Sequence, residues 1–344
     1  MIGRVIIQLL LLGLIAYFAY LTLRSLPQGS LALPGLNVTI PQITIPQNLS
    51  YPTTVLPNNT VPQNETIAYV LALINKDRSQ YGLANVSISN ITSGQQHANS
   101  MLTQDYFSHW DLYGMKPYMR YTLLGGRGSV DENVAYRYQS NGANVLTSLQ
   151  TMEYGMMYND SVCCNNGHRD NILDPNHNQV SIGVAYNKTT VYLVEDFIDN
   201  YIGWLYNTPS YSNGDTVLKG SIQRGYAIST IDVVYDQPVI NMTSATVPRT
   251  PYGFGNNVAC IGHTAGLVRY YCTQVATVNA SVYTVQGQNF DIEFNLANIV
   301  KHYGAGEYSL LVFLNNTSTG TNFIGSTYTI FINNSDQPYT PSNV

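Results

Sequence analysis

Charged residues are scarce in this sequence. Only 10% of its 344 residues are Asp, Glu, Lys or Arg, against about a quarter in typical soluble domains. The net charge is −5, and the 15 basic residues form no stripe along the chain. Because nucleic-acid binding depends on clustered basic side chains that neutralise phosphates, this composition excludes nucleic acid as a partner.

The common catalytic motifs are also absent. The sequence contains no G-x-S-x-G nucleophile elbow, no phosphate-binding P-loop and no G-x-G-x-x-G phrase before a helix. Ser108 lies beside His109, but adjacent residues rarely point their side chains at each other, so this pair is a poor nucleophile and base. Enzymatic activity is therefore left uncertain, without a convincing nucleophile.

Cysteine is rare too, and the four residues permit three pairings. Cys260 and Cys272 bracket a Gly-containing loop and are plausible partners across a hairpin. Cys163 and Cys164 are adjacent and lie shortly before His168. Their thiolates beside that histidine could ligate a metal, although oxidation outside a cell opposes this reading. We favour a disulfide role for them, and their pairing stays open.

One long apolar run stands at the N-terminus. Residues 5–23 contain Gln8 as the only strongly polar residue, and Arg4 and Arg24 bracket the run. At ~1.5 Å per residue it is long enough to cross a hydrocarbon core of ~30 Å. Residues 1–24 are therefore predicted to be a transmembrane anchor or a signal segment. The anchor is favoured because residues 25–30 form a poor cleavage site.

Residues 25–64 carry no charge and contain recurrent proline. Because each proline fixes φ and disfavours helix in the residue before it, we predict an extended spacer. N-x-[S/T] sequons recur along the whole chain, for example at Asn37, Asn187 and Asn333. Their density is typical of an exported glycoprotein at the cell surface or outside the cell.

Two patterns follow the spacer and predict an α+β protein. Apolar residues recur at helical spacing after Asn64 up to Gly82, over 93–104 and over 144–158, and a strand hairpin is predicted over 180–197. Residues 65–200 should therefore form one domain. Beyond Trp204 short alternating strands dominate, so residues 201–344 are predicted to form an immunoglobulin-like β-sandwich. We place the division near residues 201–213.

The predicted domain 65–200 carries two histidines and two glutamates in recognisable local phrases: His109, Glu132, Glu153 and His168. Neutral imidazole and carboxylate hold Zn²⁺ and similar ions, and the same groups exchange protons in acid/base chemistry. They are too far apart in the chain for the single-helix H-E-x-x-H type of site. Only a folded domain could bring them together.

The phrases occur in an order that resembles the CAP superfamily of cysteine-rich secretory, antigen 5 and pathogenesis-related proteins, also called the SCP domain. The closest likeness is to its microbial branch. The phrases are His97-Ala98-Asn99-Ser100-Met101, Phe107-Ser108-His109, Glu132-Asn133-Val134-Ala135, His168-Arg169-Asp170-Asn171-Ile172-Leu173 and Ile182-Gly183-Val184-Ala185. The resemblance covers roughly residues 65–199, so it leaves most of the chain unassigned.

The resemblance implies an α-β-α sandwich with a cleft in which these four side chains face one another and sometimes hold a divalent metal. Carried over by residue, His109 and His168 are the metal ligands, with Zn²⁺ or another divalent cation as cofactor. Glu132 and Glu153 are the catalytic candidates. Glu153 is placed only by its position in the helix before the Gly167-His168-Arg169 phrase.

Three functions remain open. The family likeness favours a surface protein that binds an extracellular protein, a glycan or a lipid, with the N-terminal segment at a membrane. The first alternative is a metal-dependent hydrolase, a peptidase or esterase of the envelope, in which a metal-activated water attacks and a glutamate serves as base. The second is a structural envelope or filament protein that self-assembles through tyrosine-rich surfaces of low charge.

Overall fold

The computed structural model describes residues 61–263, 272 and 274–341. The predicted anchor or signal segment and nearly all of the predicted spacer lie outside these residues. Within the described part, no helix is both long and apolar enough to cross a membrane. The described residues group into one compact unit.

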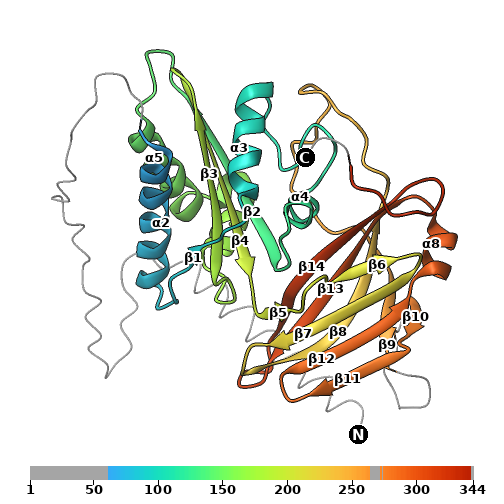
Figure 1. The fold of residues 1–344 in the computed structure, drawn as a ribbon. Helices are drawn as coiled ribbons and strands as arrows, with labels where there is room; N and C mark the ends of the chain where they lie inside the picture. Colours follow the sequence, from blue (N-terminus) through green and yellow to red (C-terminus); the bar gives the residue numbers. More distant parts are fainter. Residues whose placement is uncertain (1–60, 264–271, 273, 342–344) are drawn as a thin grey trace, which may run out of the picture. The chain divides into compact units, whose positions relative to one another are not determined.

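The first part of this unit is a four-stranded sheet between helices, in the strand order β1-β3-β4-β2 (Figure 1). The strands are β1 (Ser87–Ile88), β2 (Ser129–Tyr138), β3 (Gln179–Tyr186) and β4 (Thr190–Asp199). The helices are α2 (Gln63–Gln80), α3 (Ser93–Gln104), α4 (Pro117–Leu123), α5 (Val145–Tyr158), α6 (Ser161–Cys164) and α7 (Gly167–Ile172).

The two faces of this sheet have separate cores because successive strand residues point to opposite sides. Leu193 of β4 packs with Ile74 of α2 and Leu149 of α5. Its neighbour Val194 packs with Met101 of α3 on the other face. The α-β-α layering follows from this alternation.

The predicted helices over 65–82, 93–104 and 144–158 are confirmed as α2, α3 and α5, and the hairpin over 180–197 is confirmed as β3 and β4. The sequence did not indicate β2, α4, α6 or α7. Among these missed elements, β2 carries Glu132, α4 carries Arg120 and α7 carries His168.

A buried arginine fixes the chain just before β3. Arg78 of α2 is fully buried, and its guanidinium donates to the backbone carbonyls of Ala84, Ile172, Asp174 and His177 at 2.8–3.0 Å. Three of the four acceptors lie within residues 172–177, so this one side chain orders the connection between α7 and β3 and ties it to the segment that follows α2.

The second part consists of two five-stranded sheets around a common core. One sheet has the order β10-β9-β8-β13-β14, and the other has the order β11-β12-β7-β5 with β6 paired to β7. Val233 and Leu310 of the first sheet pack with Leu218 and Ile292 of the second. The α+β class is therefore as predicted, while the immunoglobulin-like topology and the division near residues 201–213 stay predictions.

The elements of this part are β5 (Ile202–Trp204), β6 (Ser210–Ser212), β7 (Asp215–Ile222), β8 (Tyr226–Asp236), β9 (Asn256–Gly262), β10 (Ala276–Asn279), β11 (Val282–Gln286), β12 (Asn289–Asn295), α8 (Ala297–Tyr303), β13 (Gly306–Asn316) and β14 (Asn322–Ile332). Residues 237–255, which connect β8 to β9, contain no helix or strand. We call them the cover segment.

All four cysteines are in disulfides. Cys260 pairs with Cys272, as the sequence indicated, and Cys163 pairs with its neighbour Cys164. The Cys163–Cys164 bond settles the pairing of these two cysteines, which the sequence left open.

Candidate functional site

His109 and Glu132 meet on the face of the sheet that α3 and α4 cover. His109 follows α3 in a loop, and its Nδ1 lies 3.0 Å from Oε1 of Glu132 on β2. Arg120 of α4 donates from Nη2 to the other oxygen of Glu132 at 2.6 Å. Nη1 of the same guanidinium donates to the carbonyls of His109 and Met115 at 2.7 and 2.8 Å. Arg120 therefore holds both partners in place.

Burial shifts the pKa values of His109 and Glu132 and so determines their protonation states. It raises the pKa of Glu132 to about 7, against the opposing effect of Arg120. It lowers the pKa of His109 to about 4, and the charge of Arg120 lowers it further. Asp196 of β4 lies directly opposite Glu132 of β2, and burial and then the charge of Glu132 hold the pKa of Asp196 well above the usual range. At neutral pH, His109 is therefore an uncharged ring beside Arg120 and Glu132.

The cover segment closes this site from outside. The hydroxyl of Tyr252 accepts a hydrogen bond from the backbone N–H of Glu132 at 2.9 Å, and its ring centroid lies 5.1 Å from that of His109. Ser108 Oγ donates to the carbonyl of Pro248 at 2.5 Å. Because β2 is an edge strand, its outward N–H groups need partners, and Tyr252 supplies one.

Two further contacts fasten the cover segment beside the site. The N–H of Met242 donates to the carbonyl of Leu112 at 2.7 Å, and Lys116 Nζ donates to the carbonyl of Gly253 at 2.7 Å. Val247 is buried in the core beside α3. The side chain of His109 retains 16% exposure, whereas that of Glu132 retains none.

The other two candidates lie on the opposite face of the sheet. Asn133 follows Glu132 on β2, so its side chain points away from His109. Its amide donates to the backbone carbonyl of His168 at 3.1 Å and to Glu195 Oε2 at 3.3 Å. His168, at the start of α7, therefore packs on the Asn133 face.

Glu153 of α5 reaches the same face and meets Glu195. Both carboxyl groups are buried, and burial and then the charge of Glu195 raise the pKa of Glu153 well above its usual value. Burial also raises the pKa of Glu195. Two neighbouring carboxyl groups in an apolar setting cannot both ionise at low cost, so the pair retains a proton.

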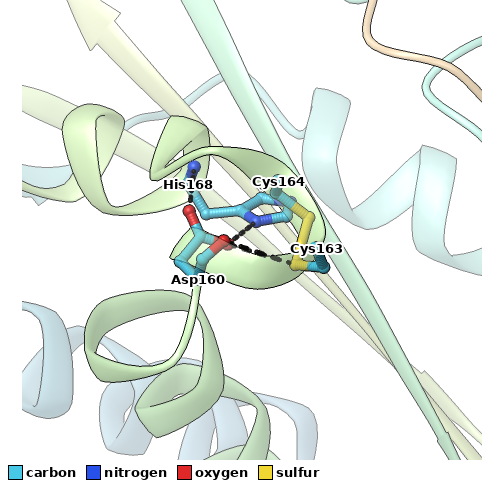
Figure 2. Close-up of side chains that lie close together, drawn as sticks. All are labelled: Asp160, Cys163, Cys164 and His168. Atoms are coloured by element: carbon cyan, nitrogen blue, oxygen red, sulfur yellow. Dashed lines mark hydrogen bonds and ion pairs between the residues drawn. A yellow bond between two sulfur atoms is a disulfide. The ribbon is translucent and has the colours of Figure 1, made fainter.

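His168 is held by Asp160 rather than by Glu153. Its Nδ1 lies 2.7 Å from Asp160 Oδ1, and its backbone N–H donates to Asp160 Oδ2 at 2.9 Å. Figure 2 shows the ring between Asp160 and the disulfide of Cys163 and Cys164. Among the described residues, these four form the only group of three or more His, Cys, Asp or Glu whose ligand atoms all lie within 4.8 Å of one another.

The four side chains implied by the resemblance therefore divide between the two faces of the sheet, with His109 and Glu132 on one and Glu153 and His168 on the other, and they do not fit a single ion. His109 and His168 approach the sheet from opposite faces, and both oxygens of Glu132 already accept hydrogen bonds. The catalytic roles of Glu132 and Glu153 and the metal roles of His109 and His168 stay predictions.

Sequence reasoning missed the charged residues that surround the candidates, namely Arg120, Asp160, Glu195 and Asp196. One signal was present for two of them. Glu195 and Asp196 lie within an otherwise apolar predicted strand, where adjacent acids must be buried on one face or the other.

Comparison with known proteins agrees with the family likeness. Residues 71–198 match the family model described as CAP, cysteine-rich secretory protein family. No curated protein matches the chain.

Solved structures similar to this chain include an extracellular protein containing an SCP domain from Bacillus anthracis, at 21% identity and a TM-score of 0.31, covering 40% of this chain and 41% of that one. An outer surface protein of Borrelia burgdorferi matches at 11% identity and a TM-score of 0.31, over 41% of this chain and 98% of that one. The CAP domain of enterococcal PrgA matches at 12% identity and a TM-score of 0.28, over 40% and 63%. The chain thus spans less than half the length of the Bacillus protein. The predicted resemblance to the CAP superfamily is confirmed by the family model, which matches residues 71–198.

Proposed function

We propose that this protein is exported and acts by binding an extracellular protein, glycan or lipid rather than by turnover. The observation that carries the proposal is the enclosure of Glu132. This carboxylate has no exposed side-chain surface, pairs with Arg120 through one oxygen and meets His109 through the other. Glu132, Arg120 and His109 therefore stabilise the fold around β2, the edge strand of the sheet.

A hydrolytic base needs a carboxylate lone pair within hydrogen-bond reach of a water and a route for substrate to that water. Glu132 uses both oxygens inside the protein, and Tyr252 and Pro248 of the cover segment lie against the same site. Glu153 is fully buried against Glu195. A retained proton on that pair also makes it a poor base.

Three features support export: the apolar N-terminal segment, the glycosylation sequons and the disulfides. The apolar segment 5–23 suits an anchor or a signal, and the sequons recur along the chain. Both disulfides suit an oxidising compartment. The partner is therefore expected outside the cell or on its surface.

The proposal predicts no metal-dependent turnover. We would load the full chain with Zn²⁺ and offer mixed peptide and ester substrates, with the His302→Ala variant as a control because this histidine is exposed on α8. Rates equal to those of protein-free Zn²⁺ are expected.

Turnover that survives in His302→Ala but vanishes in both Glu132→Gln and His168→Ala would overturn the proposal. Circular dichroism of each variant must show an intact fold for that outcome to count.

A further inference from the structure

The geometry points to a second site, away from the His109–Glu132 pair: Asp160, Cys163, Cys164 and His168 form a redox-gated site for a borderline-soft divalent cation such as Zn²⁺. The ligand atoms of these four residues lie within 4.8 Å of one another. In the disulfide form the two sulfurs are bonded to each other, so they are unavailable as thiolates. Reduction converts the same four side chains into a complete donor set.

The local backbone explains why the four side chains converge (Figure 2). Cys163 and Cys164 end the short helix α6, and Asn165 and Asn166 follow with φ of 51° and 67°. Two consecutive left-handed residues reverse the chain, since asparagine tolerates that conformation better than most residues. His168 is thereby returned toward Asp160, the residue that precedes α6.

Asp160 is the buried member of the four-residue site and holds the start of α7 in place. It is buried, and its Oδ2 accepts the backbone N–H groups of His168 and Arg169 at 2.9 and 3.3 Å. Its Oδ1 lies 3.5 Å from Cys163 Sγ. Cys163 itself is exposed and Cys164 is half-buried. A reductant can therefore reach the disulfide while the carboxylate and the imidazole keep their places.

The chemistry balances with a dithiol as reductant. Two electrons and two protons pass from the dithiol to the Cys163–Cys164 bond, which breaks to give two thiols while the reductant closes to its own disulfide. On metal binding each thiol releases its proton and ligates as a thiolate. The same exchange in reverse, with the disulfide of the dithiol reagent accepting the two electrons, rejoins the two sulfurs and releases the ion.

The donor set selects the metal class. Two thiolates, one imidazole nitrogen and one carboxylate oxygen match the tetrahedral four-ligand sites of Zn²⁺. Calcium and magnesium require more oxygen ligands than these residues supply. Ligand atoms of a tetrahedral site with bonds of about 2.0–2.3 Å lie roughly 3.3–3.8 Å apart, so only small shifts separate the present arrangement from a closed site.

The test uses the full chain with Co²⁺ as a spectroscopic substitute for Zn²⁺. After treatment with a dithiol and its anaerobic removal, the chain is expected to bind one Co²⁺ and to show a thiolate-to-cobalt charge-transfer band. Zn²⁺ should displace the cobalt, and the untreated chain should show no band. The Cys163→Ser/Cys164→Ser variant should lose the band. His168→Ala should weaken binding by about tenfold or more, since even partners behind the metal ligands contribute that much.

The matched control is Cys260→Ser/Cys272→Ser, which removes the other disulfide and should retain the band. The inference would be overturned if the reduced wild-type chain showed no band. It would also be overturned if the band were lost in this control and kept in Cys163→Ser/Cys164→Ser. If the Cys163→Ser/Cys164→Ser chain fails to fold, alkylating the reduced Cys260→Ser/Cys272→Ser chain gives the same comparison. Alkylation there should abolish binding, and persistent binding would contradict the site.

Discussion

Replacing Arg120 by alanine is expected to lower the free energy of unfolding by about 3–5 kcal/mol, because removing one member of a buried ion pair leaves the other uncompensated. Arg120 joins Glu132 to the loop that carries His109 through three hydrogen bonds of 2.6–2.8 Å. Its removal leaves the carboxylate and two backbone carbonyls without their donor. Urea unfolding followed by circular dichroism measures the loss.

Two further variants make the Arg120 result specific. Arg224→Ala removes an exposed arginine and should change stability by less than about 0.5 kcal/mol. Adding Glu132→Gln to Arg120→Ala should recover part of the loss, because the amide carries no charge to compensate. A loss below about 1 kcal/mol, or no recovery in the double variant, would show that Glu132 is not held as an ion pair.

The contribution of the Glu153–Glu195 pair to stability should fall as pH rises, and Glu153→Gln should remove this dependence. The pKa values of Glu153 and Glu195 are raised in the folded state, above the unfolded value of about 4.3. The folded pair therefore keeps a proton that the unfolded chain has lost. Its contribution to stability is complete below about pH 4.3 and is lost as the pH rises toward the folded pKa.

The Glu153→Gln comparison requires urea unfolding at several pH values between roughly 5 and 8. The wild-type chain should lose up to about 1.4 kcal/mol more per pH unit than the variant, which is the effect of one extra retained proton. Glu65→Gln, which changes an exposed glutamate in the first turn of α2, should leave the slope unchanged. Identical slopes for the wild-type chain and Glu153→Gln would contradict a shared buried proton.

Helices and strands of this protein were predictable where the apolar period was regular. The helices α2, α3 and α5 show it, and the strand β4 was recognised from its run of apolar residues instead. In contrast, β2 is buried on both faces over residues 132–134 and lacks the alternation that marks a half-buried strand. The strand that carries Glu132 was therefore missed, although the phrase containing it was recognised.

The arrangement of the candidate site depended on that missed strand. The order of phrases along the chain indicates a family, but it does not say to which face of a strand a side chain points. A shift of one position moves a side chain across the sheet, so Glu132 and Asn133 serve different sites. His109 and His168 were thus expected together and lie apart.

The cover segment was not predictable for another reason. Residues 237–255 mix polar and apolar residues, contain three prolines and have no period, so they read as a connection between strands. Their contacts with the CAP domain join residues far apart in sequence, such as Pro248 with Ser108 and Tyr252 with Glu132. Such pairs leave no local pattern in a single sequence.

The closure of the His109–Glu132 site by the cover segment is tested most directly by hydrogen–deuterium exchange of the full chain, read at single amides. The N–H groups of Met242 and Glu132, which donate to Leu112 and Tyr252, should exchange slowly. In Tyr252→Phe the Glu132 amide should exchange about fivefold faster, the effect of one hydrogen bond of about 1 kcal/mol, while Met242 stays protected. Exchange of both amides at the rate of an unstructured peptide in the wild-type chain would show that the site is open, and would contradict the proposed role in binding without turnover.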